Sequence, residues 1–154
     1  MAHPLKRPAY SYRNDPAVPA FNDEGPVVVM DGACMLCSQG ARVISRLDRK
    51  GAFRICPIET RLGAALLRHY GLEPGDPESW LLLKEGRAYA SLEAIIKVGR
   101  TVGGVGRMAA PLAILPRGAQ DWIYRRIALN RYRLFGRADM CALPDPALQA
   151  RLLR

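Results

Sequence analysis

The sequence predicts an α/β fold whose first unit is a buried strand, a tight turn and a helix. Residues 27–30 are Val-Val-Val-Met, an apolar run rich in β-branched side chains, as in a strand covered on both faces. Gly32 supplies the turn that follows the strand. Between Leu36 and Leu47 apolar residues recur at helical spacing, with polar and basic residues on the opposite face. We therefore predict a helix that ends near Gly51.

The next segments predict the remaining elements of the core. Residues 53–57 form a second short strand, stopped by Pro57. Because a helix connects it to the first strand, the two strands run parallel in a right-handed βαβ unit. The further predicted elements are a helix over 61–70, a hairpin of strands over 80–83 and 87–90, and a helix over 91–102 that begins at the N-cap Ser91.

Both ends of the chain extend beyond this core. Residues 1–25 contain several prolines and show no apolar period, so we predict a flexible N-terminal arm. Tyr10, Tyr12 and Phe21 are the side chains that would pin the arm if it packs on the domain. The domain itself spans 26–154, with a helical appendage from about residue 103.

The appendage contains a long helix over 119–135. We expect its residues Trp122, Ile123, Ile127 and Leu134 to face the core.

Composition limits the classes of protein to consider. A chain of 154 residues with 49% hydrophobic content fits one domain with a substantial core. Four unevenly spaced cysteines do not make a secreted disulfide framework, so we expect a reducing, cytoplasmic location. The formal charge of +9 is spread along the chain without a nucleic-acid motif, so no nucleic-acid partner is expected. No apolar run approaches the roughly 20 residues of a membrane-spanning helix.

Two cysteines, Cys34 and Cys37, stand at the start of the first helix as C-x-x-C. Backbone N–H groups and the helix dipole favour an anion there, which lowers a cysteine pKa and raises its reactivity. The sequence therefore predicts Cys34 as the attacking thiolate. Cys37, one turn further on and expected to be less exposed, would resolve the mixed disulfide.

Asp31 ends the first strand, just before the turn. If it is partly buried, its pKa rises toward neutrality, and it accepts or returns the proton of the resolving thiol. The alternative is a side chain that hydrogen-bonds the N–H groups of the turn. The sequence leaves these two roles open.

The motif from Asp31 to Cys37 resembles the D-x-x-C-x-x-C signature of the DCC family of thiol-disulfide oxidoreductases. The strand and turn at 81–86, the helix start at Ser91, and the segments 130–137 and 141–144 are also similar to that family. This resemblance, which covers about residue 26 to the C-terminus, implies a thioredoxin-like βαβαββα core with a C-terminal helical extension. It implies thiol-disulfide exchange between the Cys34/Cys37 dithiol and a partner protein or small thiol, with no cofactor.

One part of the thioredoxin pattern differs. Thioredoxins present a cis-proline just before the strand equivalent to 80–83, whereas here Pro77 comes early and Ser79 takes the facing position.

The other cysteines and His69 receive structural interpretations. Topology places Cys56 at the same rim of the sheet as the dithiol, where a buried, inert thiol is favoured. Cys141 is also taken as structural, and His69 as a packed boundary residue. A zinc or copper site built from Cys34, Cys37, Cys56 and His69 is the weaker alternative, because only one C-x-x-C pair is present.

A second alternative is a binding module that docks a membrane or protein partner through its basic, apolar C-terminal part. In that part, Asn130, Arg131 and Tyr132 place a positive group near the thiolate, recognise an acidic partner, or form a capped and solvated helix end.

Overall fold

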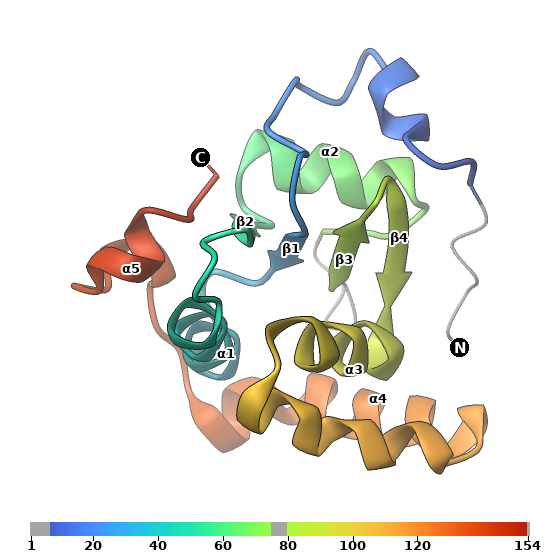
Figure 1. Ribbon diagram of the computed structural model, residues 1–154, viewed down its shortest axis with the longest axis vertical. Coiled ribbons are helices and arrows are strands. Elements are labelled where there is room, and N and C mark those ends of the chain that lie inside the picture. Colours follow the sequence, from blue (N-terminus) through green and yellow to red (C-terminus); the bar gives the residue numbers. More distant parts are fainter. Residues whose placement is uncertain (1–6, 75–79, 154) are drawn as a thin grey trace.

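The computed structural model describes residues 7–74 and 80–153. Its four-stranded sheet has the order β2-β1-β3-β4 (Figure 1). The strands are β1 (Val27–Met30), β2 (Arg54–Pro57), β3 (Leu81–Lys84) and β4 (Arg87–Ala90). β1 pairs with β2 in parallel, as predicted for the βαβ unit, and with β3 in antiparallel orientation.

Helices connect and extend these strands. They are α1 (Met35–Leu47), α2 (Arg61–His69), α3 (Ser91–Val102), α4 (Arg117–Phe135) and α5 (Pro146–Gln149), with 3₁₀ helices η1 (Ser11–Asn14), η2 (Gly104–Ile114) and η3 (Met140–Ala142). The order from β1 to α3 is the predicted βαβαββα, and the mixed sheet is consistent with a thioredoxin-like fold. The chain then continues through η2 into α4.

Helices cover both faces of the sheet, as the continuous apolar run of β1 predicts. Val27 and Val29 pack in a buried cluster with side chains of α2, and Val28 and Met30 pack in a second cluster with side chains of α1 and α3. Figure 1 shows α2 on one side of the sheet and α1 and α3 on the other, with α4 outside α1 and α3. The core therefore positions the β1–α1 turn beneath the C-terminal extension.

The sequence left open whether the arm packs on the domain, and from Tyr10 onward the arm does so, with the N–H of Tyr10 donating to the carbonyl of Gly86 at 2.8 Å. Tyr12 is 3% exposed, lies in the cluster around α2, and has Phe21 packed beside it. His69 joins arm and domain, because its ring nitrogens contact Asp15 Oδ2 at 2.7 Å and Ser11 Oγ at 2.8 Å. Aromatic burial and these polar contacts offset the entropy lost on ordering the segment.

The expectation that α4 turns its apolar residues toward the core is largely wrong. Trp122, Ile127 and Leu134 are exposed, and the buried residues of α4 are Ala128 and Arg131. The apolar residues of α4 are spread around the helix, so only a narrow strip contacts α1 and α3. No helix among the described residues is long and apolar enough to cross a membrane.

Gly63 lets α2 approach the end of β2. A Cβ at this position would lie 2.3 Å from the backbone oxygen of Pro57, whereas one at Gly40 of α1 would meet nothing within 4 Å. We expect Gly63→Ala to destabilise the protein by about 2 kcal/mol or more, because backbone must move. The matched Gly40→Ala should be neutral or stabilising by up to about 1 kcal/mol through helix propensity. Urea unfolding of both variants tests this, and equal stabilities would contradict the packing.

Candidate functional site

Cys34 is the N-cap residue of α1, with extended backbone angles before the helix begins. Its carbonyl accepts the N–H of Ser38 at 2.9 Å, which starts the helix. This position puts Cys34 at the amino end of the helix, where its side chain makes no capping hydrogen bond. The predicted relation between Cys34 and the helix start is thus present.

A segment of the extension lies across Cys34. Arg137 forms an antiparallel bridge with Cys34, and Gly136 O accepts the N–H of Met35 at 3.2 Å. The N–H groups of Ala138 and Met140 donate to the carbonyls of Ala33 and Gly32. Cys34 is consequently 0% exposed, whereas Cys37 is partly exposed. The sequence-based expectation that Cys37 is the less exposed sulfur is therefore wrong, because it took no account of the segment over the thiol turn.

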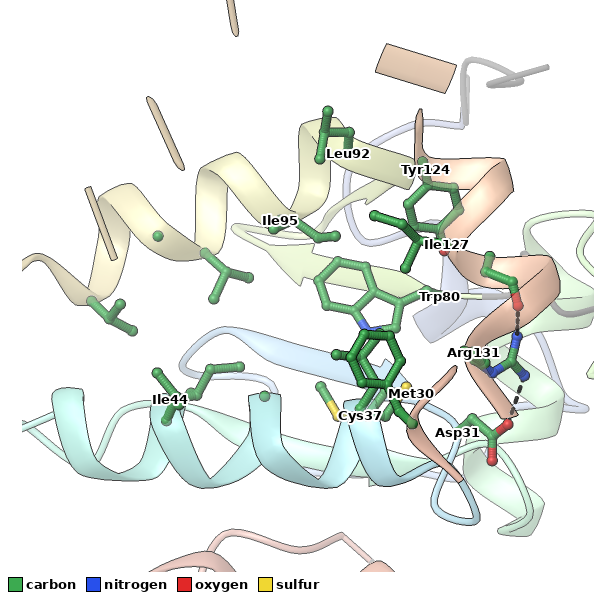
Figure 2. Close-up of a pocket in the computed structure, with 18 of the residues that line it drawn as sticks. Met30, Asp31, Cys37, Ile44, Trp80, Leu92, Ile95, Tyr124, Ile127 and Arg131 are labelled. Carbon is green, nitrogen blue, oxygen red and sulfur yellow. Dashed lines mark hydrogen bonds and ion pairs between the residues drawn. The ribbon is translucent and has the colours of Figure 1, made fainter. Parts of the chain in front are cut away.

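Cys37 opens on a cavity of about 570 Å³ between α1, α3 and α4. Figure 2 shows Cys37 near the indole of Trp80, with Ile95 and Ile127 on the walls contributed by α3 and α4. Burial and then the neighbouring Cys34 sulfur raise the pKa of Cys37 well above its usual range. Cys37 therefore holds its proton more firmly than an exposed thiol does.

Asp31 is 4% exposed and is clamped by groups from α4. Its Oδ2 lies 2.6 Å from Arg131 Nη2 and also accepts the hydroxyl of Tyr132. Its Oδ1 accepts the N–H of Ala33 at 2.8 Å, so the turn-capping role that the sequence left open is present.

These partners decide the ionisation of the carboxyl group. Burial alone would raise the pKa of Asp31, but the hydrogen bonds from Tyr132, Arg131 and Ala33 outweigh it and lower that pKa. The expectation of a raised pKa, on which the proton-transfer role depended, is contradicted because Arg131 supplies a cation in the buried site.

A second carboxyl group lies beside the clamp. Glu59 Oε2 accepts the N–H of Gly32 at 3.2 Å, and it interacts with Asp31. Burial of its carboxyl end, and the negative Asp31 beside it, raise the pKa of Glu59. The two carboxyl groups thus have pKa values shifted in opposite directions, and Glu59 is the one that holds a proton more readily.

The remaining cysteines lie apart from this site. Cys56 is at the expected rim, paired with Val29 in the register of β1 and β2, but it belongs to the cluster on the α2 face, opposite Cys37. Burial raises its pKa to about 11. Cys141, expected to be structural, is exposed.

The structure shows no metal site in the part of the chain that it describes. There, no group of three or more His, Cys, Asp or Glu side chains is arranged to hold a metal ion. His69, one of the suggested ligands, instead contacts Ser11 and Asp15 of the arm. Pro77 and Ser79, the positions compared with the cis-proline of thioredoxins, lie outside the described residues.

Comparison with known proteins identifies the family. The model of the DCC1-like thiol-disulfide oxidoreductases matches residues 28–137, which include the dithiol and the Arg131–Tyr132 clamp. The chain belongs to this family. The DCC-family region thus includes α4 as well as the sheet.

Two relatives support this membership. An uncharacterized protein of Bacillus subtilis, YuxK, is 32% identical over 127 residues, covering 82% of this chain and 93% of that protein. A chloroplastic DCC family protein of Arabidopsis thaliana is 32% identical over 122 residues, covering 79% of this chain and 71% of that protein. No solved structure matches the chain.

Sequence reasoning missed Glu59 and left the role of Arg131 undecided. Arg131 was considered as a positive group near the thiolate, and the structure brings it to Asp31, 100 positions away in the chain. The periodicity of α4 could not have found it, because apolar residues lie all around the helix and only the structure shows that Ala128 and Arg131 are the buried residues. Trp80 and Gly40, which line the cavity, gave no signal in the sequence.

Removing Arg131 should be costly, because it leaves Asp31 buried without its cation. We expect Arg131→Met to lower the free energy of unfolding by about 3 kcal/mol near pH 7. The exposed Arg133 of the same helix provides the control, and Arg133→Met should change stability by about 0.5 kcal/mol or less. Urea unfolding measures both.

The pH dependence tests the ionisation of Asp31. In the parent protein its lowered pKa gives a contribution that is present above the ordinary carboxyl pKa and is lost as pH falls through the folded-state value. In Arg131→Met burial raises that pKa. The difference in the free energy of unfolding between the parent protein and Arg131→Met should therefore become smaller when the pH is lowered from about 7 to about 5. A difference that stays constant or becomes larger at the lower pH would contradict an ionised Asp31 paired with Arg131.

Proposed function

We propose that the Cys34/Cys37 pair exchanges a dithiol for a disulfide with a thiol-bearing or disulfide-bearing partner. Family membership supports a redox role in general. The observation that carries the specific proposal is the difference between the two sulfurs: Cys34 sits at the N-cap of α1, and Cys37 opens on a cavity. A helix N-terminus stabilises a thiolate, and a sulfur must be reachable to meet a partner.

The exposures favour an assignment of roles opposite to the one expected from the sequence. Cys37 is the sulfur that forms the mixed disulfide with the partner, and Cys34 is the sulfur that leaves or resolves. The opposite order, with Cys34 attacking the partner, requires the segment from Gly136 to Met140 to move off Cys34.

The exchange balances without a further reactant. A partner thiolate attacks Cys37 of the protein disulfide, the bond between Cys34 and Cys37 breaks, and its electron pair leaves on Cys34. A second partner thiolate attacks the partner sulfur of the mixed disulfide and releases Cys37, which takes up a proton because its pKa is raised. The partner is oxidised to a disulfide and the protein is reduced to a dithiol; the reverse sequence reduces the partner.

Asp31 and Arg131 act on this chemistry through their charges. The negative Asp31 raises the pKa of Cys37 and the positive Arg131 lowers it, so the pair presents little net charge to the sulfurs. Asp31 is thus proposed as a positioning residue that holds the turn and the extension. We also propose a reducing, cytoplasmic location, because four unevenly spaced cysteines do not make a secreted disulfide framework.

A second function, docking on a membrane or protein partner, is supported by the surface of α4. Trp122, Leu129 and Leu134 are exposed there, among several arginines. A double variant, Cys34→Ser with Cys37→Ser, distinguishes the two functions. Docking through α4 should be retained in this variant, whereas thiol-disulfide exchange should be lost.

Trapping the mixed disulfide tests the order of the two sulfurs. In a Cys141→Ser background, which removes the exposed thiol, we expect reduced Cys34→Ser treated with bis(2-hydroxyethyl) disulfide to accumulate an adduct on Cys37. Cys37→Ser should form adduct far more slowly, because Cys34 is covered. Intact-mass and peptide-mapping mass spectrometry measure the adducts, and the parent protein should proceed to the internal disulfide.

The opposite result has a defined meaning. Adduct on Cys34 in Cys37→Ser, with none in Cys34→Ser, would reverse the assigned roles. An absence of exchange in the parent protein, with both thiols shown to be reduced, would contradict the oxidoreductase proposal itself.

A further inference from the structure

The cavity next to Cys37 has the size and chemistry of a ligand site. Its volume of about 570 Å³ lies within the range of about 300–1,000 Å³ that is typical of small-molecule pockets. Three helices form its walls: α1 contributes Gly40 and Ile44, α3 contributes Ile95, and α4 contributes Ile127 (Figure 2). Trp80 supplies an aromatic face beside Cys37.

The lining decides what class of molecule fits. Nearly all of the side chains are aliphatic or aromatic, and of the polar ones Asp31 and Arg131 are held in their ion pair. A protein disulfide brings two polypeptide backbones with it, and their amide groups would lose water here without finding partners. A small molecule with a hydrocarbon body carries no such cost. The cavity therefore favours a compact, hydrocarbon-rich ligand over a polypeptide segment.

The cavity also contains a reactive group, the thiol of Cys37. Cys37 lines the cavity, whereas Cys34 lies beneath the Arg137 bridge with 0% exposure. A molecule in the cavity thus meets one sulfur of the pair, and that sulfur is the one assigned to the mixed disulfide.

We infer that the cavity between α1, α3 and α4 binds the alkyl or aryl part of a small-molecule disulfide, or of the corresponding thiol, and delivers its sulfur to Cys37. This inference deepens the proposed exchange function and rests on it. In the reducing direction Cys37 loses its proton and its thiolate attacks the ligand; the ligand S–S bond breaks, one alkyl half joins Cys37 and the other leaves as a thiolate. Cys34 then loses its proton and attacks Cys37, which forms the protein disulfide and displaces the bound half as a second alkyl thiolate. The two alkyl thiolates take up the two protons that the cysteines released.

A homologous series of disulfides tests the inference. We would measure second-order rate constants for oxidation of the reduced protein, in the Cys141→Ser background, by diethyl, dipropyl and dibutyl disulfide. Each buried methylene improves binding about fourfold. The rate constants should therefore rise about fourfold for each methylene by which the alkyl chain in the cavity is lengthened. The control is the reaction of the same three disulfides with dithiothreitol, a dithiol without a cavity. Its rate constants should not rise along the series.

Gly40 offers a variant that fills the cavity without a clash. A Cβ at Gly40 meets nothing within 4 Å, so Gly40→Leu should place its side chain in the cavity and preserve α1. We expect the ratio of the dibutyl disulfide rate to the bis(2-hydroxyethyl) disulfide rate to fall at least tenfold. Gly118→Leu is the matched control, because Gly118 is also a helical glycine with open space and lies outside the cavity lining. Circular dichroism and urea unfolding check that both variants fold.

Binding can be followed without any sulfur chemistry. In Cys34→Ser with Cys37→Ser and Trp122→Phe, Trp80 is the remaining tryptophan, and it lines the cavity. Dibutyl disulfide should change its fluorescence in a saturable way, and Gly40→Leu should weaken this binding at least tenfold.

The outcomes separate the inference from the proposed function. Exchange with bis(2-hydroxyethyl) disulfide that shows no rise along the alkyl series supports the oxidoreductase and overturns the ligand class. If the rate constants of Gly40→Leu rise along the alkyl series as steeply as those of the parent protein, the cavity is not the cause of the rise. A protein that forms a dimer in solution through this cavity, and does not bind dibutyl disulfide, overturns the inference as well. An absence of exchange with every disulfide contradicts the proposed function itself, whatever the fluorescence titration shows.

Discussion

The ion pair between Asp31 and Arg131 is the interaction on which the arrangement of the site depends. It joins the turn that carries the dithiol to α4, which lies far along the chain. A buried ion pair adds little net stability compared with apolar packing, but losing one partner is costly. It therefore fixes one position of α4 over the turn, and the bridge from Arg137 to Cys34 follows from that position.

This docking gives two chemically equal side chains different surroundings. Cys34 lies at the start of α1 under the extension, and Cys37 lies one turn on, at the edge of an apolar cavity. Asp31 alone would oppose a thiolate nearby, and Arg131 compensates its charge. The two sulfurs therefore differ in access, because Cys34 is buried and Cys37 lines the cavity.

Much of the fold follows from short-range sequence patterns. The buried run of β1, the Glu85-Gly86 turn between β3 and β4 and the apolar stripe of α1 each predict their element, because each pattern satisfies the geometry of that element locally. The same approach misplaced Trp122 and Leu134, which are exposed on α4. A helix with apolar residues on every side does not specify which strip is buried, since this depends on what it packs against.

The sequence by itself determined the order of strands and helices, the family motif and the place of the dithiol at a helix start. These features depend on neighbours within a few residues, where spacing is sufficient. Only the tertiary structure decided that Arg131 and Tyr132 hold Asp31, that Glu59 lies beside them, and that Cys37 is the sulfur with access to the cavity. Burial and charge pairing are set by residues distant in the chain, so exposure and pKa emerge when the extension packs over the turn.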